Sequence, residues 1–342
     1  MNTFFLDRLN SEPHALAFAG QSTPWPVALA DQSANPALDE ALHTHAAAAQ
    51  ALLYPVSAEL LATTGRPVDL FGFEPNPARL GAAAAASASV PGIALTQLGA
   101  LLDAVALGYN PAQAKPVAVL GHSQGVLAVH MVQAICEAGS IDAAAAKIDE
   151  ILAIATLIGV AGTRQARQLG LAARHGEATP MLSVKDITRA QVDALIERVD
   201  GARGPIAVAV TNSATHYVLS GYPEDLAAFG VEVAKEHKRQ AKLREEKVRG
   251  GRVFDPTLEY LDVTLPFHSP LMADAVSQAV AWAEACGINA DHARELAAEV
   301  LLNHVDWAAR VRALMKSTDP SALWVLDFGP GNTVGKLFST VA

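Results

Sequence analysis

The segment VAVLGHSQGVLAVH, residues 117–130, constrains the fold more than any other part of the chain. An apolar run ends at Gly121, polar residues follow, and an apolar pattern with helical spacing begins after Gly125. A strand that becomes a helix within so few residues forces Ser123 into a strained turn, where the glycines remove side chains that would clash. The pattern therefore predicts a nucleophile elbow, with the Ser123 hydroxyl exposed at the edge of a buried sheet.

Strand and helix patterns alternate on both sides of this elbow. KPVAVL (115–120) is a continuous apolar run of the kind buried in a parallel sheet. HALAFAG (14–20) and LWVLDFG (323–329) predict further strands, and alanine-rich helical patterns cover 37–63 and 92–108. This order is typical of the α/β class, with helices packed around a parallel sheet.

The middle of the chain has a different pattern. Strand and helix signals follow one another in the order β-α-β-β-α, namely in MLSVKD (181–186), TRAQVDALIERV (188–199), IAVAVTNS (206–213), HYVLSG (216–221) and PEDLAAFGVEVAKEH (223–237). That order predicts a small split-βαβ subdomain over 179–250, inserted between residues 1–178 and 251–342 of a large subdomain. LDVTLP (261–266) predicts the strand by which the chain returns to the large subdomain.

Charge and cysteine content exclude several classes of protein. The net charge of −10 argues against nucleic-acid binding. Two isolated cysteines, Cys136 and Cys286, give neither a disulfide framework nor a metal-binding spacing, which favours a reducing cytoplasm. MNTFFLDRLN lacks the basic start of a signal peptide, and Pro91 interrupts the longest weakly polar stretch. We therefore expect a cytoplasmic protein with no membrane span and no metal site.

A serine nucleophile needs a base, and His268 is the best candidate among eleven histidines. It lies in LPFHSP, in a loop directly after an apolar run, and strand-end loops are where open α/β sheets place chemistry. A surface-loop histidine is the alternative. His122 adjoins Ser123, but neighbours on a strand point to opposite faces, so it is expected to line or support the pocket. Histidines on helical patterns are expected to be solvated or packed: His43, His45, His130, His237 and His292.

These motifs together resemble the acyl-CoA:carrier-protein transacylases. The resemblance rests on six segments in order along the chain: FAGQS (18–22), GHSQG (121–125), NSATHYVLSG (212–221), FHSPLM (267–272), LNHVDW (302–307), with His304 where proline is usual, and DFGPGN (327–332). Four segments resemble more narrowly the acetyltransferase domain of actinobacterial type I fatty acid synthases: SVPGIALTQ (89–97), GHSQGVLAV (121–129), LIGVAGT (157–163) and KVRGGRVF (247–254).

The resemblance implies an α/β-hydrolase-like core joined to a ferredoxin-like small subdomain, and it assigns roles to residues. It makes Ser123 the nucleophile and His268 the general base. The backbone N–H groups of Gln124 and Gln21 would form the oxyanion hole, and the backbone carbonyl of Asn303 would steer the imidazole in place of a carboxylate. Asn212 is implied to be structural or to face the pantetheine.

The resemblance also implies the reaction partners. Acetyl-CoA would be the acyl donor, and the phosphopantetheine thiol of an acyl carrier protein the acceptor. Other domains of a type I fatty acid synthase would be further partners. No metal and no permanently bound cofactor are implied.

The acyl group is predicted from one position in the next helix. Transacylases for malonyl groups carry an arginine there, whose planar guanidinium binds the carboxylate. This chain has Ile158 followed by Gly159. A malonyl carboxylate buried without a partner would cost on the order of several kcal/mol, so a neutral acetyl group is expected. Arg164 lies six residues later, about 240° around the helix and so on another face, and Arg164 and Arg167 are expected to be solvated.

Alternatives remain open at this point. The chain could be a malonyl transacylase, or a serine hydrolase or thioesterase with an acid residue at Asp186, Asp225 or Asp262. It could also be an inert scaffold domain of a megasynthase. The basic run at 235–252 would bind CoA phosphates or an acidic carrier protein, or would be a solvated helix or a domain interface.

Overall fold

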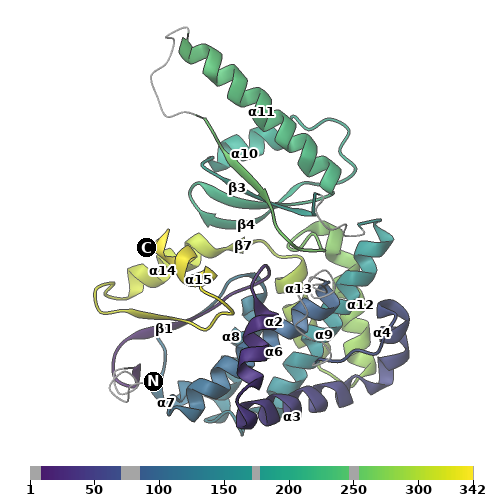
Figure 1. Ribbon diagram of the computed structural model, residues 1–342, viewed down its shortest axis with the longest axis vertical. Helices are drawn as coiled ribbons and strands as arrows, with labels where there is room; N and C mark the ends of the chain where they lie inside the picture. Colours follow the sequence, from purple (N-terminus) through teal and green to yellow (C-terminus); the bar gives the residue numbers. More distant parts are fainter. Residues whose placement is uncertain (1–8, 71–84, 172–177, 246–253, 342) are drawn as a thin grey trace.

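The computed structural model describes residues 9–70, 85–171, 178–245 and 254–341, which form a lower large subdomain and an upper small subdomain (Figure 1). The large subdomain contains a parallel sheet in the order β2-β1-β8. Strand β1 (His14–Phe18) is buried along its whole length and pairs on one side with β2 (Ala118–Gly121) and on the other with β8 (Trp324–Asp327). The predicted α/β class with a parallel sheet is confirmed.

Helices surround this sheet and supply most of the core. Two long helices, α6 (Ala86–Ala106) and α9 (Ala145–Gln168), pack closely against each other. Among the described helices, α6 alone is long and apolar enough to cross a membrane, but 72% of its most apolar window is buried inside the protein. The other α-helices of the large subdomain are α2 (Trp25–Ser33), α3 (Pro36–Leu52), α4 (Ser57–Thr64), α7 (Pro111–Ala114), α8 (Val126–Ala138), α12 (Ala273–Ala285), α13 (Ala290–Leu301), α14 (Trp307–Ser317) and α15 (Thr333–Ser339).

Short 3₁₀-helices connect several of these elements. They are η1 (Tyr54–Val56), η3 (Ser123–Gly125) and η4 (Pro270–Met272). The continuous helical pattern predicted over 37–63 is therefore divided in the structure, because η1 contains Pro55 and separates α3 from α4. Proline lacks an N–H group and cannot continue the hydrogen-bond ladder of an α-helix.

The small subdomain has the ferredoxin-like order β-α-β-β-α-β. Its elements are β3 (Met181–Lys185), α10 (Arg189–Ile196), β4 (Ala207–Ser213), β5 (His216–Ser220), α11 (Pro223–Glu245) and β6 (Thr257–Tyr260). Apolar residues alternate along its strands, so one face of the sheet forms a separate core with α10 and α11: Leu182, Val184, Leu219, Leu226 and Phe229 are among its members. The opposite face contributes Val210 and Val218 to the main core of the large subdomain.

The return strand predicted at 261–266 is misplaced. The strand lies earlier, at β6, where it pairs antiparallel with β3. Residues 261–266 form no strand, and Val263 and Leu265 are apolar because they fill the main core from a loop. β6 is an exposed edge strand, so its sequence lacks the apolar pattern that the prediction relied on.

A short strand from the large subdomain completes the upper sheet. The sheet order is β6-β3-β5-β4-β7, and β7 (Val305–Asp306) pairs parallel with β4. Val210 lies opposite Val305, and Thr211 lies opposite Asp306. β6 follows residue 250 but belongs to the small subdomain, which therefore extends beyond the predicted bounds of 179–250. β7 comes from the large subdomain, so the two subdomains are joined by backbone pairing as well as by side-chain packing.

Candidate active site

The elbow forms where β2 ends and η3 begins. Ser123 has a φ of 54°, in the left-handed region that non-glycine residues rarely adopt. A Cβ at Gly121 would lie 2.5 Å from the backbone nitrogen of Val126, and one at Gly125 would lie 2.3 Å from the carbonyl oxygen of Phe18. Both glycines are therefore required by close backbone approach, as the pattern predicted.

The structure brings Ser123 and His268 together from positions 145 residues apart. The Ser123 Oγ lies 2.6 Å from the His268 Nε2. The other ring nitrogen, Nδ1, lies 2.7 Å from the backbone carbonyl oxygen of Asn303. Because a carbonyl only accepts, Nδ1 carries the proton and Nε2 is left to accept the serine hydroxyl. This is the tautomer that a general base for Ser123 requires.

Burial keeps this histidine neutral. His268 is 2% exposed. Its pKa is lowered to about 3, chiefly because burial removes water from the charged form, while the hydrogen bond to the Asn303 carbonyl acts in the opposite direction. A neutral imidazole at neutral pH is ready to take a proton from the serine.

The hydrolase alternative required a carboxylate behind the histidine. That position is occupied by the Asn303 carbonyl. Of the three candidate aspartates, Asp225 accepts hydrogen bonds from the backbone N–H groups of Arg203 and Gly204, so it organises a turn of the small subdomain.

Gln21 and Gln124 lie on the two segments that meet beside the serine. The Nε2 of Gln21 donates to the Oε1 of Gln124. The Nε2 of Gln124 donates in turn to the carbonyl of Val90 at 2.7 Å, which fixes its side chain. Gln124 is the second residue of η3, and the first N–H groups of a helix have no acceptor within it. These side-chain bonds hold the two segments next to each other beside the elbow.

Gln97 fixes the position of the loop that contains Gln21. It is fully buried on α6, and its Nε2 donates to the carbonyl oxygens of Ala19 at 2.7 Å and Gly329 at 3.2 Å. The N–H of Ala19 also donates to the carbonyl of Gly329. The turn Gly329-Pro330-Gly331, called here the GPG turn, therefore supports the loop after β1. Gln97 ends the segment SVPGIALTQ (89–97), but the sequence assigned it no role, because a lone glutamine in an apolar helical pattern does not reveal its hydrogen-bond partners.

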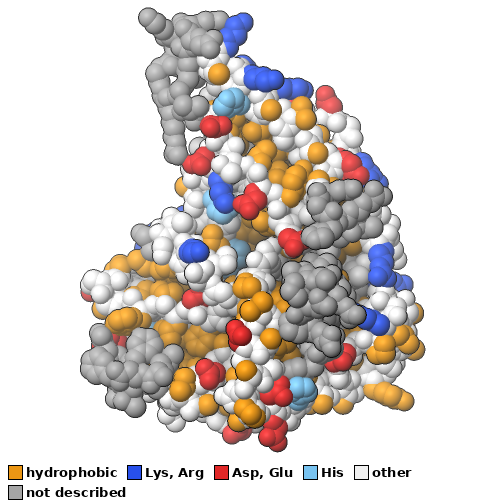
Figure 2. Space-filling view, in the orientation of Figure 1, with side chains coloured by type: hydrophobic (Ala, Val, Ile, Leu, Met, Phe, Trp, Pro, Cys, Tyr) orange, Lys and Arg blue, Asp and Glu red, His pale blue; other side chains and the backbone are white. Residues whose placement is uncertain are grey.

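His122 and Asn212 lie at the junction of the subdomains. The Nε2 of His122 is 2.8 Å from the Oδ1 of Asn212, and the Asn212 Nδ2 is 3.4 Å from the Nε2 of His216. His216 also lies 3.1 Å from the Oγ of Ser183 on β3. In Figure 2, histidine side chains lie where the upper and lower parts of the molecule meet. His216 was missed because a histidine at the start of a strand gives no signal of its own.

Ile158 and Gly159 are buried in α9. Ile158 is fully buried in the main core. A Cβ at Gly159 would lie 2.3 Å from the carbonyl oxygen of Ala86, so this glycine permits the close packing of α9 against α6. Arg164 is more than a solvated residue, because its Nη1 donates to Gln278 on α12 at 3.0 Å.

One cation near the catalytic pair was not predicted. Arg310 on α14 donates from Nη1 to the carbonyl oxygen of Gly121 at 2.8 Å. Its positive charge also lowers the pKa of His268, but less than burial and less than the nearby His122 and His304. The guanidinium thus holds the end of β2 immediately before the elbow.

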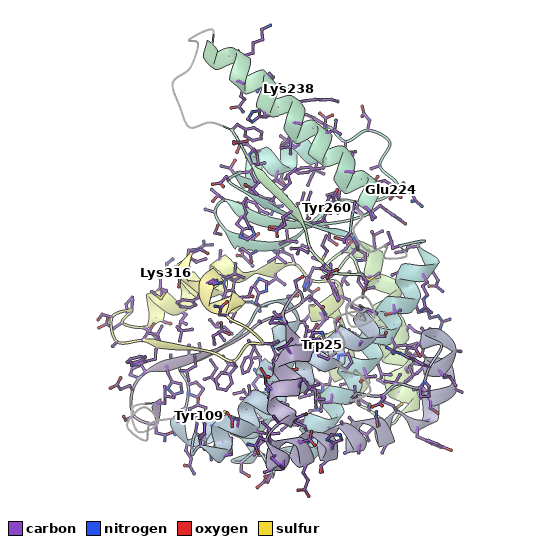
Figure 3. The ribbon with its side chains drawn as sticks, viewed as in Figure 1. Trp25, Tyr109, Glu224, Lys238, Tyr260 and Lys316 are labelled. Carbon is purple, nitrogen blue, oxygen red and sulfur yellow. The ribbon has the colours of Figure 1, made fainter. Side chains whose placement is uncertain are left out.

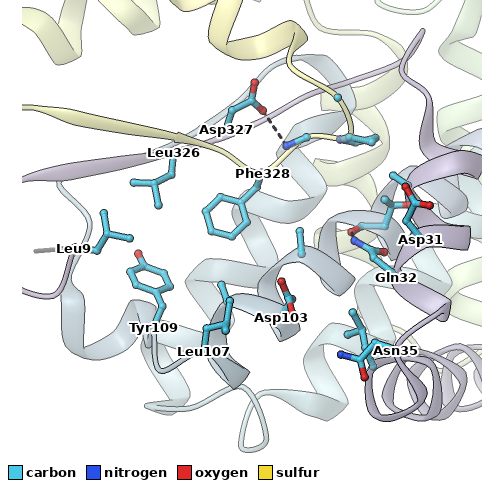
Figure 4. A pocket seen from close by; sticks show the side chains of 18 of the residues that line it. Leu9, Asp31, Gln32, Asn35, Asp103, Leu107, Tyr109, Leu326, Asp327 and Phe328 are labelled. Carbon is cyan, nitrogen blue, oxygen red and sulfur yellow. Dashed lines mark hydrogen bonds between the residues drawn. The ribbon is translucent and has the colours of Figure 1, made fainter. Parts of the chain in front are cut away.

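A separate cavity of about 670 Å³ lies beside β8 (Figure 4). Its wall includes Asp31, Asp103, Tyr109 and Phe328, together with the GPG turn. Burial raises the pKa of Asp327 in this wall. Neither Ser123 nor His268 lines the cavity, so it is distinct from the candidate active site.

Comparison with known proteins finds similarity to fatty acid synthases. Residues 180–260, from β3 through β6, match the family described as the fatty acid synthase central AT domain. The fatty acid synthase beta subunit TOXC of Cochliobolus carbonum is 26% identical over 291 residues, which are 73% of this chain and 13% of that protein. The chain thus spans a small part of that relative's length.

Solved structures share the fold over almost the whole chain. The malonyl CoA-acyl carrier protein transacylase from Burkholderia pseudomallei superposes with a TM-score of 0.58 at 15% identity, covering 97% of this chain and 98% of that one. A malonyl-transacylase, PlMCAT, solved with its type II polyketide acyl-carrier protein AntF, gives 0.57 at 18% identity, covering 96% and 93%. The chain therefore has the α/β fold of the malonyl-CoA:acyl-carrier-protein transacylases, and its small subdomain matches the fatty acid synthase central AT domain.

Proposed function

We propose that this protein is an acyltransferase that moves an acetyl group from acetyl-CoA to the phosphopantetheine thiol of an acyl carrier protein. The observation that carries the proposal is the 2.6 Å contact between Ser123 Oγ and His268 Nε2 at a nucleophile elbow, with Nδ1 bound to a backbone carbonyl. Such a pair generates a serine nucleophile without a metal or redox cofactor.

The first half-reaction forms an acetyl-serine. As the Ser123 oxygen bonds to the thioester carbonyl carbon, its proton passes to Nε2 of His268. The backbone N–H groups of Gln124 and Gln21 stabilise the negative charge on the former carbonyl oxygen. The carbon–sulfur bond then breaks, and the CoA thiolate takes the proton from His268 as it leaves.

The second half-reaction runs the same steps with a new thiol. His268 takes the proton of the phosphopantetheine thiol, the sulfur attacks the acetyl-serine, and the proton returns to the Ser123 oxygen. The scheme is a ping-pong reaction with one covalent intermediate. Transfer in place of hydrolysis requires that water be kept from the ester, and the burial of both side chains, 9% exposed for Ser123 and 2% for His268, favours this.

The residues favour the transfer of an uncharged acyl group. Ile158 offers no positive charge to a carboxylate. Arg310, a cation that contacts the end of β2 before the elbow, already donates to the Gly121 carbonyl. Malonyl transfer is the second candidate, because the similar solved structures are named as malonyl transacylases.

A carrier protein is the expected acceptor, since PlMCAT was solved with its acyl-carrier protein. The basic run at 235–252 is one candidate docking surface for an acidic carrier. Lys and Arg side chains gather at the upper end of the molecule over α11 (Figure 2), and Lys238 lies on the outer half of that helix (Figure 3). Arg239 is bound to Glu236 and Lys235 to Glu232. Residues 246–252 of the run lie outside the described residues.

The test is the intact mass of the protein after brief exposure to acetyl-CoA, malonyl-CoA or palmitoyl-CoA in competition. An acetyl adduct on the wild type that is absent from Ser123→Ala is expected. Absence of any adduct on the wild type would refute the proposal. A predominant malonyl adduct would show that the transferred group is malonyl and not acetyl. Rapid release of free acetate, faster than transfer to pantetheine, would identify a hydrolase.

A further inference from the structure

Two consecutive residues of β4 contact the surroundings of both catalytic side chains. Asn212 binds His122, the residue before the nucleophile. Thr211 binds His304, the residue after the Asn303 carbonyl that holds the base. One strand of the small subdomain thus contacts a residue next to Ser123 and a residue next to the carbonyl that holds His268. Ser123 and His268 themselves lie 145 residues apart in the chain.

The contact on the nucleophile side is buried and directional. Asn212 is 3% exposed. Its Oδ1 can only accept, so His122 donates from Nε2, and its Nδ2 donates to His216. Ser183 adds a second contact to the same His216 nitrogen at 3.1 Å. These bonds anchor the His122 ring to β3 and β5.

Packing restricts His122 from the other side. Its ring lies edge-on against Trp307, with 5.4 Å between the ring centroids. His122 has extended backbone, whereas Ser123 directly after it has a φ of 54°. Because that strained turn is fixed by its neighbours, a ring held on both sides limits how far the serine can move.

The contact on the base side combines backbone pairing with a side-chain bond. β7 pairs with β4 through Val210–Val305 and Thr211–Asp306. The Thr211 Oγ1 lies 3.0 Å from the His304 Nε2. Asn303 and His304 are exposed, so packing contributes little to holding this segment. The Asn303 N–H donates to the carbonyl of Ala298 at 2.8 Å, which fixes the segment at its other end.

We propose that Thr211 and Asn212 are positioning residues that set the distance between Ser123 and His268 and couple it to the placement of the small subdomain. The proposal rests on the proposed function in that Ser123 is the nucleophile. Misplacement of reacting groups by about 1 Å can lower a rate by about 100-fold. The buried Asn212 contact is expected to matter more than the exposed Thr211 contact, where water competes.

A small fluorophosphonate probe tests the geometry without any pantetheine. The Ser123 oxygen bonds to phosphorus, fluoride leaves, and His268 takes the hydroxyl proton, so the labelling rate reports on the pair alone. Asn212→Ala is expected to label about tenfold or more slowly than the wild type. Thr211→Val is expected to label about threefold more slowly, and Thr211→Ser, which keeps the hydroxyl, at the wild-type rate.

Thr179→Val is the matched control in the same subdomain. It removes a hydroxyl that bonds to the carbonyls of Met181 and Leu261, away from both His122 and His304, and it is expected to label at the wild-type rate. Thermal unfolding of every variant confirms that it is folded. With acetyl-CoA, Asn212→Ala and Thr211→Val are expected to lower the maximal acylation rate and leave the half-saturating concentration unchanged.

Other outcomes separate this inference from the proposed function. Wild-type labelling by Asn212→Ala, with slow acylation by acetyl-CoA, would overturn positioning and make Asn212 a contact for the pantetheine. If Asn212→Ala and Thr211→Val label slowly but the wild type forms no acetyl-serine, the positioning role stands and acetyl transfer is refuted. Equal labelling of all folded variants would overturn the inference whatever the cargo.

Discussion

The backbone carbonyl of Asn303 lies 2.7 Å from the Nδ1 of His268, in the position where many serine hydrolases have a carboxylate. The carbonyl orients the ring without adding a charge, so the pKa of His268 stays low, at about 3, in its buried site. The chemistry of the pair follows from this neutral histidine.

Asn303→Ala is expected to keep acylation within about threefold of the wild type, because the contact to His268 is made by the backbone and not by the amide. His268→Gln removes the base and is expected to slow acylation by about 1000-fold or more. Rapid mixing followed by intact mass measures both rates. A loss in Asn303→Ala as large as that in His268→Gln would show that the amide side chain takes part.

The acylation rate is expected to stay level as the pH falls from 7.5 to 5. Only the neutral form of His268 can accept the serine proton, and with a pKa lowered to about 3 that form persists throughout this range. The rate of acetyl-serine formation at saturating acetyl-CoA measures the profile. A decline with a midpoint near the ordinary histidine value of about 6.5 would contradict the low pKa.

Stability is expected to fall as the pH drops from about 6.5 to about 4. The pKa of His216 is lowered from 6.5 to about 4, chiefly by burial, and that of His268 to about 3. Over this window the unfolded chain binds protons that the folded chain does not, so acid favours unfolding. Urea unfolding at several pH values measures the slope.

His216→Gln is expected to make that slope shallower, because glutamine keeps an acceptor for Asn212 and does not titrate. His43→Gln, on the exposed side of α3, controls for the substitution itself. An equally steep slope in His216→Gln would mean that His216 titrates alike in both states.

Ile158→Arg is expected to raise the ratio of malonyl to acetyl loading, because a guanidinium binds a carboxylate in two hydrogen bonds. Ile158→Met keeps an apolar side chain of similar size and is expected to retain the acetyl preference. Competition between the two CoA esters, read by mass, gives the ratio. An unchanged ratio in a folded Ile158→Arg protein would place Ile158 away from the acyl group.

Gly125→Ala is expected to abolish acylation and to destabilise the protein by about 2 kcal/mol or more. The added Cβ would lie 2.3 Å from the carbonyl oxygen of Phe18 and 3.0 Å from that of Ala19, so this backbone segment would have to move. Gly139→Ala at the end of α8, with open space around its Cβ but a φ of 86°, separates backbone strain from steric conflict. Retained activity in Gly125→Ala would show that the elbow can widen.

The elbow could be predicted from the sequence because its causes are local. A strand, a tight turn and a helix follow one another within residues 117–130, and each leaves its own pattern of apolar residues and glycines. The α/β class and the split-βαβ order could be predicted for the same reason. Where the local signal is weak, the prediction was wrong: β6 is an exposed edge strand, and the apolar residues at 261–266 fill the core from a loop.

The contacts that make the site depend on segments far apart in the chain. Periodicity and spacing do not show that His268 reaches Ser123, or that Asn303 presents its carbonyl to His268. The place of His268 in a loop after an apolar run made it a candidate base, and the role of Asn303 was implied only by resemblance. The pairing of β4 with the two-residue strand β7, and the bonds from Asn212 through His216 to Ser183, had no sequence signal at all. A backbone carbonyl is present at every residue, so only the tertiary structure decides which one faces the histidine.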